Sequence, residues 1–347
     1  MTSSNGAERR REAAIAGLGQ RVRAAVAAAV PRGARVALLD FPEYGNVGDS
    51  VIWLGQLAAI RAAGATVEYA ASVASYDGAR LRRNLRPGEA VVLLSGGGNF
   101  GDLWPLHGEL RKRVLSELPD FRIVQLPQSI HFNDPRNVDA TRNLLKGHGS
   151  FTLMVRDEAS KALAQERLDQ PVVLCPDVAF ALGPVARPVA PEQPIVWLSR
   201  DDQEGPATPT GAGDGPARID WVDEPDLQLP IFDRVLARWK AAGGPVSARW
   251  IARSLHSRAA IRMRHGARML ARGHVVVTNR LHGMILSMLM GVPQFVSDTR
   301  QGKISAFHGT WLRDALPGVM CATEREALAR GRALAESLAA EGAHEAG

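Results

Sequence analysis

The segment at residues 278–283, with the sequence TNRLHG, combines a planar cation with a titratable ring at the end of a predicted strand. Arg280 and His282 flank Leu281, so both polar side chains point the same way if the backbone stays extended. The guanidinium of Arg280 can donate a fork of hydrogen bonds to a carboxylate or a phosphate, and His282 can carry a proton near pH 7. This pattern predicts a site for an anionic substrate that must be protonated. Its structural alternative is a capping histidine beside a surface arginine.

Two glycine-rich segments and one charged segment also follow predicted strands. The glycine-rich segments are GNVGDS at 45–50 and GGGNFG at 96–101, and both are expected to form loops that precede helices. Such loops can turn backbone N–H groups and a helix N-terminus toward an anion; the alternative is a purely structural turn. The charged segment is SRDDQE at 199–204, which is expected to place Arg200 in a cleft with acidic side chains bonded around it, or else to form a solvated charged turn.

Two further strand-end segments and several absent motifs limit the kinds of site that the sequence predicts. The segments RDE at 156–158 and PDVAF at 176–180 are expected to be mostly structural, with Asp157 capping the helix that follows it. The chain has two cysteines, no HExxH motif and no Cys/His cluster, so no metal site is predicted. No GxSxG motif marks a serine nucleophile. GGGNFG is not followed, about 20 residues later, by an acidic residue in the strand context that a dinucleotide-binding fingerprint requires.

The elements that must position these segments alternate between strands and helices. Short runs rich in Val, Leu and Ile predict strands buried on both faces, at residues 36–39, 91–94, 123–126, 153–155 and 172–174. Helices are predicted between them, at residues 50–63, 104–118, 136–147 and 157–168. This alternation predicts a parallel sheet in an α/β layer fold.

A run of prolines at 183–194 predicts a linker, after which the α/β plan repeats. Strands are predicted at 195–199, 219–222, 275–278 and 294–297, a flexible loop at 205–216, and helices at 227–242, 256–272, 281–290 and the C-terminus. The expected organisation is an N-terminal basic helix at 1–34, an N-terminal α/β domain at 35–185 and a C-terminal α/β domain at 195–347. Two such domains predict a ligand cleft where the carboxyl ends of their strands face each other.

Residues 7–30 predict a basic, alanine-rich helix whose apolar positions share one face. Ile15, Leu18, Val22 and Val26 follow helical spacing, and PRG at 31–33 ends the helix. The helix is expected to pack on the first domain; the alternative is a membrane-surface helix whose arginines at 9–11, 21 and 23 meet anionic lipid. No apolar run approaches the length of a bilayer span and no secretory signal is expected, so the predicted location is the cytoplasm.

The charge balance points to anionic partners. The chain of 347 residues carries 42 lysines and arginines against 36 acidic residues, which gives a formal net charge of +6. A positive field favours phosphorylated metabolites or acidic lipid surfaces. Nucleic acid is not expected as a partner, because no recognised motif is present and aromatic residues make up only 5% of the chain.

An ordered set of segments resembles the polysaccharide pyruvyl transferase family over residues 35–312. The matching segments are GNVGDSVIWLG at 45–55, LLSGGGNFGDLW at 93–104, LPQSI at 126–130, VRDEAS at 155–160, PDVAF at 176–180, WLSRDDQE at 197–204, VVTNRLHGMILSMLMGVPQFVSD at 276–298, GKISAF at 302–307 and TW at 310–311. The resemblance implies two Rossmann-like domains in a GT-B-like arrangement with an interdomain cleft. It also implies transfer of the enolpyruvyl unit of phosphoenolpyruvate onto two sugar hydroxyls as a cyclic ketal, with phosphoenolpyruvate a substrate and no cofactor.

The same resemblance implies roles for residues on the phosphoenolpyruvate side. Arg280, Leu281 and His282 match the family's RLH motif, which is associated with phosphoenolpyruvate binding and acid catalysis, so His282 is the expected general acid. Arg200 matches the arginine that opens the second domain. Lys303 is expected to contact phosphate, although the chain has RQ at 300–301 where a tyrosine is expected before the glycine. The second domain is therefore the expected donor side, and its arginines supply positive charge without a metal.

Acceptor recognition is expected in the first domain, near Asn46, Asp49, Asn99 and Asp102. The implied acceptor is a sugar of a cell-surface polysaccharide or of its lipid-linked precursor, which fits a peripheral contact with the inner face of the membrane. Two alternatives stay open. One is a GT-B-type glycosyltransferase that uses a nucleotide sugar, although such a donor site usually needs a ribose-binding carboxylate where this chain has TNRLHG and SDTR. The other is a non-catalytic glycan-binding protein, which would bind no phosphoenolpyruvate.

Overall fold

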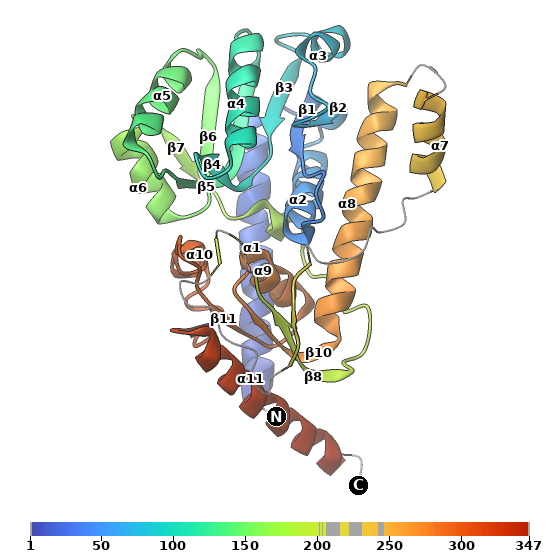
Figure 1. Ribbon diagram of the computed structural model, residues 1–347, viewed down its shortest axis with the longest axis vertical. Coiled ribbons are helices and arrows are strands. Elements are labelled where there is room, and N and C mark those ends of the chain that lie inside the picture. The colour runs from blue at the N-terminus through green and yellow to red at the C-terminus, as the bar shows by residue number, and fades with distance from the viewer. Residues whose placement is uncertain are drawn as a thin grey trace.

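The protein contains two parallel β-sheets that lie one above the other along its longest axis, as the computed structural model shows (Figure 1). The structure describes residues 2–200, 202, 204–205, 216–221, 231–241 and 246–345. Within these residues every strand pairing is parallel. The fold is therefore a mixed, Rossmann-like α/β fold, as the alternating pattern of the sequence predicts.

The upper sheet runs in the order β2-β1-β3-β5-β6-β7, and β4 pairs with β5 beside this path. Its strands are β1 (Arg35–Phe41), β2 (Thr66–Ser72), β3 (Ala90–Leu94), β4 (Gly97–Gly101), β5 (Arg122–His131), β6 (Phe151–Val155) and β7 (Val172–Leu174). The lower sheet runs in the order β12-β11-β10-β8-β9. Its strands are β8 (Gln193–Leu198), β9 (Arg218–Ile219), β10 (Gly273–Thr278), β11 (Gln294–Ser297) and β12 (Met320–Cys321).

Both sheets reverse their strand order at their first strand. In the upper sheet β1 lies between β2 and β3, and in the lower sheet β8 lies between β9 and β10. Chains leave neighbouring strands in opposite directions at such a point, which opens a crevice at the carboxyl ends of the two strands. The topology therefore singles out the segments that follow β1, β3, β8 and β10 as places for ligands.

Helices cover both faces of each sheet. They are α1 (Thr2–Ala29), α2 (Val47–Ala62), α3 (Gly78–Asn84), α4 (Pro105–Glu117), α5 (Pro135–Lys146), α6 (Glu158–Arg167), the short 3-10 helix η1 (Val178–Leu182), α7 (Ile231–Ala241), α8 (Ala248–Ala271), α9 (Leu281–Met290), α10 (Lys303–Trp311) and α11 (Glu324–Glu345). One hydrophobic core holds the inner faces of both sheets together with α1, α2, α8 and α9. A second core lies under α3 to α6, and a third lies under α11.

The predicted strands and helices are confirmed in most places, and the differences have local causes. The structure adds β2, α3, β4 and β12, which the sequence did not suggest. β2 reads TVEYAAS and lacks an uninterrupted aliphatic run, and β4 is rich in glycine. Helix α8 begins at Ala248, earlier than the predicted 256. Within the predicted helix 227–242 the structure has α7, while residues 206–215 of the predicted loop and residue 222 of the predicted strand lie outside the described residues.

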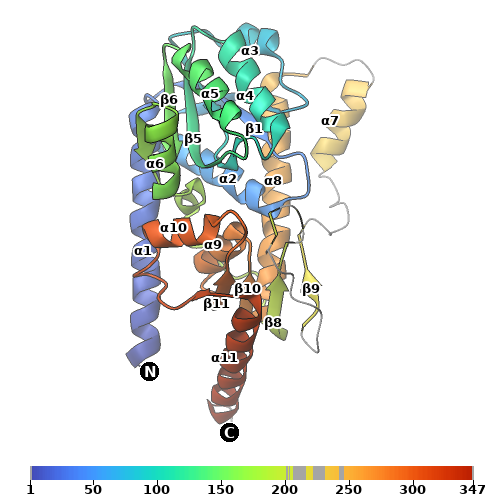
Figure 2. The same cartoon turned by 60° about the vertical axis from the view of Figure 1, so that its left-hand side comes forward.

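Helix α1 packs on the protein, as the first of its two interpretations predicts. Its predicted apolar face is buried in the core that joins the two sheets, at Ile15, Leu18, Val22 and Val26. The helix runs alongside both halves of the molecule (Figure 2), and Arg11 Nη1 donates to the carbonyl of Met288 in α9 at 2.9 Å. The apolar face that a membrane-surface helix would need is therefore already occupied.

Within the described part of the chain, no helix combines the length and the apolar character needed to cross a bilayer.

Shortening a buried side chain of α1 tests this packing. Ile15 is fully buried, so Ile15→Ala should lower the free energy of unfolding by about 2–5 kcal/mol through lost burial and a residual cavity. Gln20→Ala, at an exposed position of the same helix, should change it by no more than about 0.5 kcal/mol. Urea unfolding followed by circular dichroism measures both. Equal, small effects would mean that α1 does not belong to the core.

Candidate functional site

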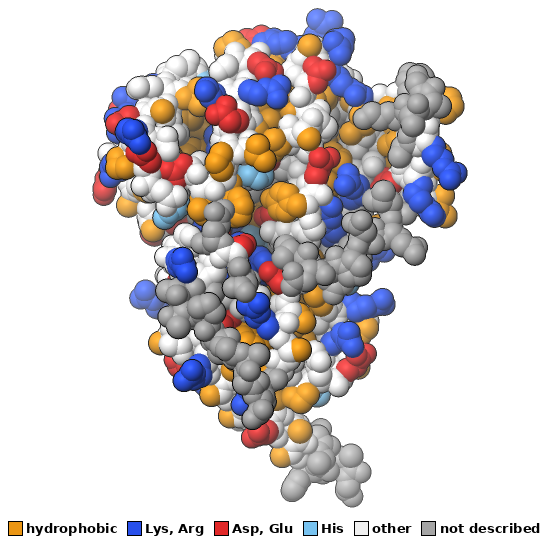
Figure 3. Space-filling model, in the orientation of Figure 1, with side chains coloured by type: hydrophobic (Ala, Val, Ile, Leu, Met, Phe, Trp, Pro, Cys, Tyr) orange, Lys and Arg blue, Asp and Glu red, His pale blue; other side chains and the backbone are white. Residues whose placement is uncertain are grey.

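A cavity of about 410 Å³ lies between the carboxyl ends of the two sheets. The upper half contributes Tyr44, Asn46, Gly48, Asp49, Gly98, Asn99, Trp104, Pro105, Leu106, His107 and Arg156, and the lower half contributes Arg200, Asp202, Glu204, Trp221, Arg280, Leu281, His282 and Lys303. On the face shown in Figure 3, charged, hydrophobic and histidine side chains gather at the waist of the molecule between the halves. The cavity is thus built by the strand ends that the topology singles out.

The predicted site residues are brought together in this cavity. All eight of the side chains expected to act there line it, namely Asn46, Asp49, Asn99, Arg200, Arg280, Leu281, His282 and Lys303. Asp102, which was expected near the acceptor, does not line this cavity. Its carboxylate instead accepts hydrogen bonds from the backbone N–H groups of Asn133 and Asp134, at 2.8 and 2.9 Å. Asp102 therefore anchors the loop before α5.

Helices α2, α4, α9 and α10 begin at the cavity wall, and they differ in how their first turns are satisfied. Helix α4 begins with Pro105, which has no N–H, and the N–H of His107 donates to the carbonyl of Trp104 at 3.1 Å. At α2 the side chain of Asn46 accepts from the N–H of Gly48, and at α10 the carboxylate of Asp298 accepts from the N–H groups of Ile304 and Ser305. Helix α9 begins after Arg280, and no side chain of the described residues caps it. Its uncapped first turn and its positive dipole end suit an anion.

Arg200 and Lys303 share one buried carboxylate. Arg200 Nη1 donates to Glu204 Oε2 at 2.5 Å, and Lys303 Nζ donates to Glu204 Oε1 at 2.7 Å. Burial alone raises the pKa of Glu204, but the charges of Lys303 and Arg200 outweigh it and hold this pKa below its ordinary value. Trp104 Nε1 of the upper half also donates to Glu204, at 2.9 Å. Glu204 therefore ties two cations of the lower half to the upper half.

The expectation that acids surround Arg200 is confirmed for the described residues. Arg200 Nε donates to Asp202 Oδ1 at 2.8 Å, in addition to the bond with Glu204. Burial lowers the pKa of Lys303, and the charge of Glu204 opposes this shift. Buried cations of this kind are strong partners for an anion, because little water screens them.

Arg280 lies deeper, beside α9. One of its terminal nitrogens pairs with the carboxylate of Asp220, and its guanidinium lies 5.8 Å from the centre of the Trp221 ring. Arg280 Nε and Asp220 Oδ1 are buried, and neither has a hydrogen-bond partner among the described residues. Since a buried donor without a partner is costly, Arg280 keeps hydrogen-bonding capacity at the cavity wall for a ligand to use.

His282 belongs to a buried chain of hydrogen bonds. Its Nε2 lies 3.1 Å from Asp177 Oδ2, which also accepts from Arg156 Nη1 at 2.7 Å. Burial alone raises the pKa of Asp177, but the adjacent His282 and Arg156 outweigh it and hold this pKa well below its usual range. Asp177 is therefore a carboxylate that fixes the ring orientation of His282. The bond engages Nε2, so the Nδ1 side of the ring remains for other partners.

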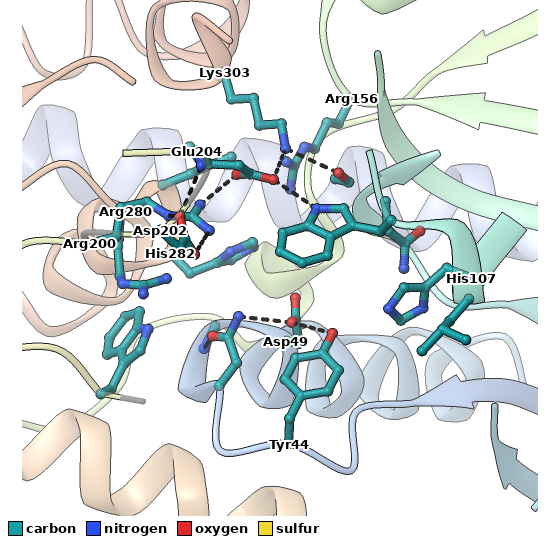
Figure 4. A pocket seen from close by; sticks show the side chains of 18 of the residues that line it. Tyr44, Asp49, His107, Arg156, Arg200, Asp202, Glu204, Arg280, His282 and Lys303 are labelled. Carbon is teal, nitrogen blue, oxygen red and sulfur yellow. Dashed lines mark hydrogen bonds and ion pairs between the residues drawn. The ribbon is translucent and has the colours of Figure 1, made fainter. Parts of the chain in front are cut away.

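A second histidine lies on the opposite wall, with a small polar cluster (Figure 4). His107 Nδ1 lies 2.8 Å from Asp40 Oδ1. Nearby, the carboxylate of Asp49 accepts from Tyr44 Oη and from Asn46 Nδ2, both at 2.9 Å. This wall offers hydroxyl, amide, carboxylate and aromatic groups, which suit a ligand rich in hydroxyl groups.

The glycine-rich segment at 96–101 does not form the predicted anion-binding loop. Most of it is strand β4, which pairs with β5. Its use of glycine has a packing reason: a β-carbon at Gly98 would lie 3.1 Å from both Arg156 Nη2 and Lys303 Nζ. The carbonyl of Gly98 also accepts from Lys303 Nζ at 3.1 Å. The segment therefore lets two cations approach the backbone closely.

Several residues of the site escaped the sequence analysis. They are Tyr44, Trp104 and His107, together with Arg156 and Asp177, which were expected to be mostly structural. Asp157 does cap α6 as predicted, through a bond from the N–H of Ser160. Arg156 and Asp177 lie in segments that carry the family resemblance, so that resemblance was the available signal. Asp40 and His107 are 67 residues apart in the chain, so no local sequence pattern predicts that they form a pair.

The described residues hold no group of three or more His, Cys, Asp and Glu side chains arranged to bind a metal ion. The arrangement instead brings together three arginines and a lysine, the uncapped N-terminus of α9 and two histidines with carboxylate partners. Such a site can bind a ligand that carries two anionic groups and can exchange protons with it.

Comparisons with known proteins agree with this chemistry. The family model described as polysaccharide pyruvyl transferase matches residues 46–299. Pyruvyl transferase 1 of Schizosaccharomyces pombe is 33% identical to this chain over 290 residues, covering 80% of this chain and 70% of that protein. A protein of Bacillus subtilis named putative pyruvyl transferase EpsO is 30% identical over 289 residues, covering 82% of this chain and 87% of that protein.

A solved structure supports the fold. It is that of a functionally uncharacterized protein of Klebsiella pneumoniae, with a TM-score of 0.51 and 17% sequence identity. The match covers 86% of this chain and 94% of that chain. At this identity the likeness concerns the fold alone.

A glycine in α2 positions His282, and its replacement gives a test. A β-carbon at Gly48 would lie 2.9 Å from the β-carbon of His282, so Gly48→Ala should displace that ring and change its imidazole NMR signals. The melting temperature should fall as well, because the added carbon meets a β-carbon that cannot move aside without the backbone, and overpacking of this kind costs about 1–3 kcal/mol. Gly17→Ala, in α1 with no atom within 4 Å of the added carbon, should leave the His282 signals in place. Unchanged signals in Gly48→Ala would show that this contact does not hold the ring.

Proposed function

The chain belongs to the polysaccharide pyruvyl transferase family, and from that premise we propose that it transfers the enolpyruvyl unit of phosphoenolpyruvate onto two hydroxyls of a sugar, forming a cyclic pyruvate ketal. The observation that carries this proposal is the convergence of Arg200, Arg280 and Lys303 with His282 at the uncapped start of α9. Phosphoenolpyruvate has a phosphate and a carboxylate, and its vinyl carbon must be protonated. The cluster matches all three demands.

The donor binds by exchange of ion pairs. In the free protein each cation of the cluster has an internal carboxylate partner: Asp202 and Glu204 for Arg200, Glu204 for Lys303, and Asp220 for Arg280. A phosphate or carboxylate of the donor can take over these bonds, and bidentate contacts with arginine are the strongest of them. The released carboxylates lose partners, so the net affinity is smaller than the sum of the new bonds.

Catalysis requires a proton on the terminal vinyl carbon. His282 donates it in the proposed mechanism, and the electron pair of the double bond forms the new C–H bond. The adjacent carbon becomes electrophilic, a sugar hydroxyl attacks it, the bond to phosphate breaks and a second hydroxyl closes the ring. Asp177 keeps the imidazole in orientation throughout. A positioned acid of this kind contributes about 10²–10⁴ in rate.

The acceptor lies against the upper half in this proposal. Asn46, Asp49 and Asn99 offer hydrogen bonds there, and Trp104 offers an aromatic surface. We assign the acceptor to a cell-surface polysaccharide or its lipid-linked precursor, made on the cytoplasmic side with the enzyme in contact with the inner membrane face. The two halves, at 35–185 and 195–347, then act as the acceptor and donor domains of a GT-B-like pair, with the helix at 1–34 packed along them.

A transfer assay tests the proposal against its alternatives. The protein is incubated with phosphoenolpyruvate and a panel of synthetic glycosides, and in parallel with nucleotide sugars and the same panel. The proposal predicts release of phosphate and a glycoside heavier by one pyruvate less one water, from the first mixture only. Transfer from a nucleotide sugar would establish a glycosyltransferase instead. Glycan binding with no reaction in either mixture would establish a binding protein.

Two variants should separate donor binding from proton transfer. Arg280→Ala removes hydrogen bonds to a charged group, each worth about 1.5–3 kcal/mol, so it should weaken phosphoenolpyruvate binding about 10- to 100-fold. His282→Gln should leave that affinity within a few-fold and lower kcat by about 10²–10⁴. Calorimetry measures the first effect and phosphate release measures the second. A His282→Gln enzyme that keeps more than about a tenth of the parental rate would remove His282 from the acid role.

A further inference from the structure

The cavity has a second pair of histidine and carboxylate, which the proposed mechanism leaves without a role. His107 and His282 lie on opposite walls, and each side chain is 11% exposed (Figure 4). Behind them, Asp40 and Asp177 are 5% and 1% exposed. The reaction moves protons in two places, since the vinyl carbon gains one and the acceptor hydroxyls lose theirs. In the proposed mechanism His282 protonates the vinyl carbon, and no residue has yet been assigned to take the protons of the acceptor hydroxyls.

The ring of His107 is held so that one nitrogen remains for a ligand. Its Nδ1 lies 2.8 Å from Asp40 Oδ1 and 3.0 Å from Asp40 Oδ2. A carboxylate that accepts from Nδ1–H fixes the neutral tautomer whose Nε2 can accept a proton. Because His107 lines the cavity, that acceptor nitrogen belongs to a side chain a bound ligand can reach.

The backbone at Asp40 is itself unusual. Asp40 is the penultimate residue of β1, and it has a φ of 72°. It lies at the point where the upper sheet reverses its strand order. A positive φ is uncommon in residues other than glycine, although Asp and Asn tolerate it better than most. Asn99 Nδ2 donates to Asp40 Oδ2 at 3.1 Å and fixes the second carboxylate oxygen. The carboxylate of Asp40 is therefore held in place by the strand that carries it, by the positive φ of its backbone and by the hydrogen bond from Asn99.

We propose that His107, oriented by Asp40, is the general base that takes the proton of the attacking acceptor hydroxyl. The assignment rests on the proposed function and deepens it, because it names the residue that activates the acceptor. His107 belongs to the upper half, with its ring centre 6.3 Å from that of Tyr44, whereas His282 belongs to the lower half and follows Arg280 by two residues. The proposed base, His107, and the proposed acid, His282, therefore reach the cavity from its two different halves.

The proton balance of the transfer fits two histidines. In the first step the hydroxyl oxygen forms a bond to C2 of phosphoenolpyruvate, its proton passes to His107 Nε2, and His282 delivers a proton to C3. In the second step the bond between C2 and the phosphate oxygen breaks, the second hydroxyl bonds to C2, and its proton leaves with the phosphate. His107 then returns its proton to His282 through solvent. No oxidant, reductant or further reactant is needed.

Asp49 is the rival base in this cavity, and its surroundings argue against it. Its Oδ2 already accepts from Tyr44 Oη and Asn46 Nδ2. A carboxylate that already accepts two hydrogen bonds is a weak base toward a further hydroxyl proton. Asp49 is better suited to accept a hydrogen bond from a second acceptor hydroxyl.

The surroundings of His107 predict the direction of a pH effect. Burial alone lowers the pKa of His107, but the hydrogen bond and charge of Asp40 outweigh it and hold this pKa above its ordinary value. The other charged groups that face the ring are Asp49 from α2, which raises the pKa, and Arg111 from α4, which lowers it. A base acts in its neutral form, so kcat/KM must fall as the pH drops through this pKa. Removing the charge of Asp40 lowers the pKa and moves that fall to lower pH.

Variants of His107 and Asp40, with a control variant at His131, test the assignment against the parental enzyme. His107→Gln should lower kcat by about 10²–10⁴ while phosphoenolpyruvate affinity and acceptor KM stay within a few-fold. Asp40→Asn keeps a residue that tolerates positive φ, and it should shift the acidic limb of the kcat/KM profile to lower pH. His107→Ala should regain activity when imidazole is added to the buffer. His131→Gln, a histidine of β5 outside the cavity, is the matched control and should behave as the parent.

Each outcome decides between the assignment and its competitors. If the parental enzyme transfers pyruvate and His107→Gln keeps more than about a tenth of its rate, the base is another group and the proposed function survives. A large loss in Asp49→Asn with little loss in His107→Gln would make Asp49 that group. A loss in His107→Gln with an unshifted acidic limb in Asp40→Asn and no imidazole rescue in His107→Ala would reduce His107 to a positioning residue. A parental enzyme that transfers nothing would overturn both proposals.

Discussion

Buried cations need counter-charges, and this constraint organises the centre of the molecule. Arg200, Arg280 and Lys303 must lie close together to hold a ligand with two anionic groups, yet such charges repel each other where water is scarce. Asp202, Glu204 and Asp220 balance them in the free protein. The balancing carboxylates make the cluster compatible with a stable fold, and in the proposed function they are the partners that a donor must displace.

The same balance links the two sheets. Glu204 accepts from Trp104 of the upper half as well as from two cations of the lower half, and Lys303 reaches the backbone of Gly98. Beneath this polar layer, one hydrophobic core shared by α1, α2, α8 and α9 joins the inner faces of both sheets. The position of the donor cations relative to the opposite wall is therefore fixed by polar contacts across the cavity and by apolar packing behind it.

Local patterns of the sequence predicted the α/β plan and most of the site, because aliphatic runs mark buried strands and short motifs mark their ends. Arg280 and His282 were found in this way, and both line the cavity. The sequence did not reveal the role of a residue where that role depends on contacts with residues distant in the chain. The glycines of β4 serve close packing against cations, and Asp102 anchors a neighbouring loop. The pair of Asp40 and His107 depends on a left-handed backbone that no composition or periodicity reveals.

In the proposed mechanism the donor replaces the internal carboxylates as partner of the cation cluster. A crystal structure of the protein with phosphoenolpyruvate measures this most directly. The account predicts the ligand within hydrogen-bond distance of Arg200, Arg280 and Lys303, near the start of α9, with at least one bond to Asp202, Glu204 or Asp220 broken. Phosphoenolpyruvate bound away from this cluster, or bound there with every internal ion pair intact, would contradict it.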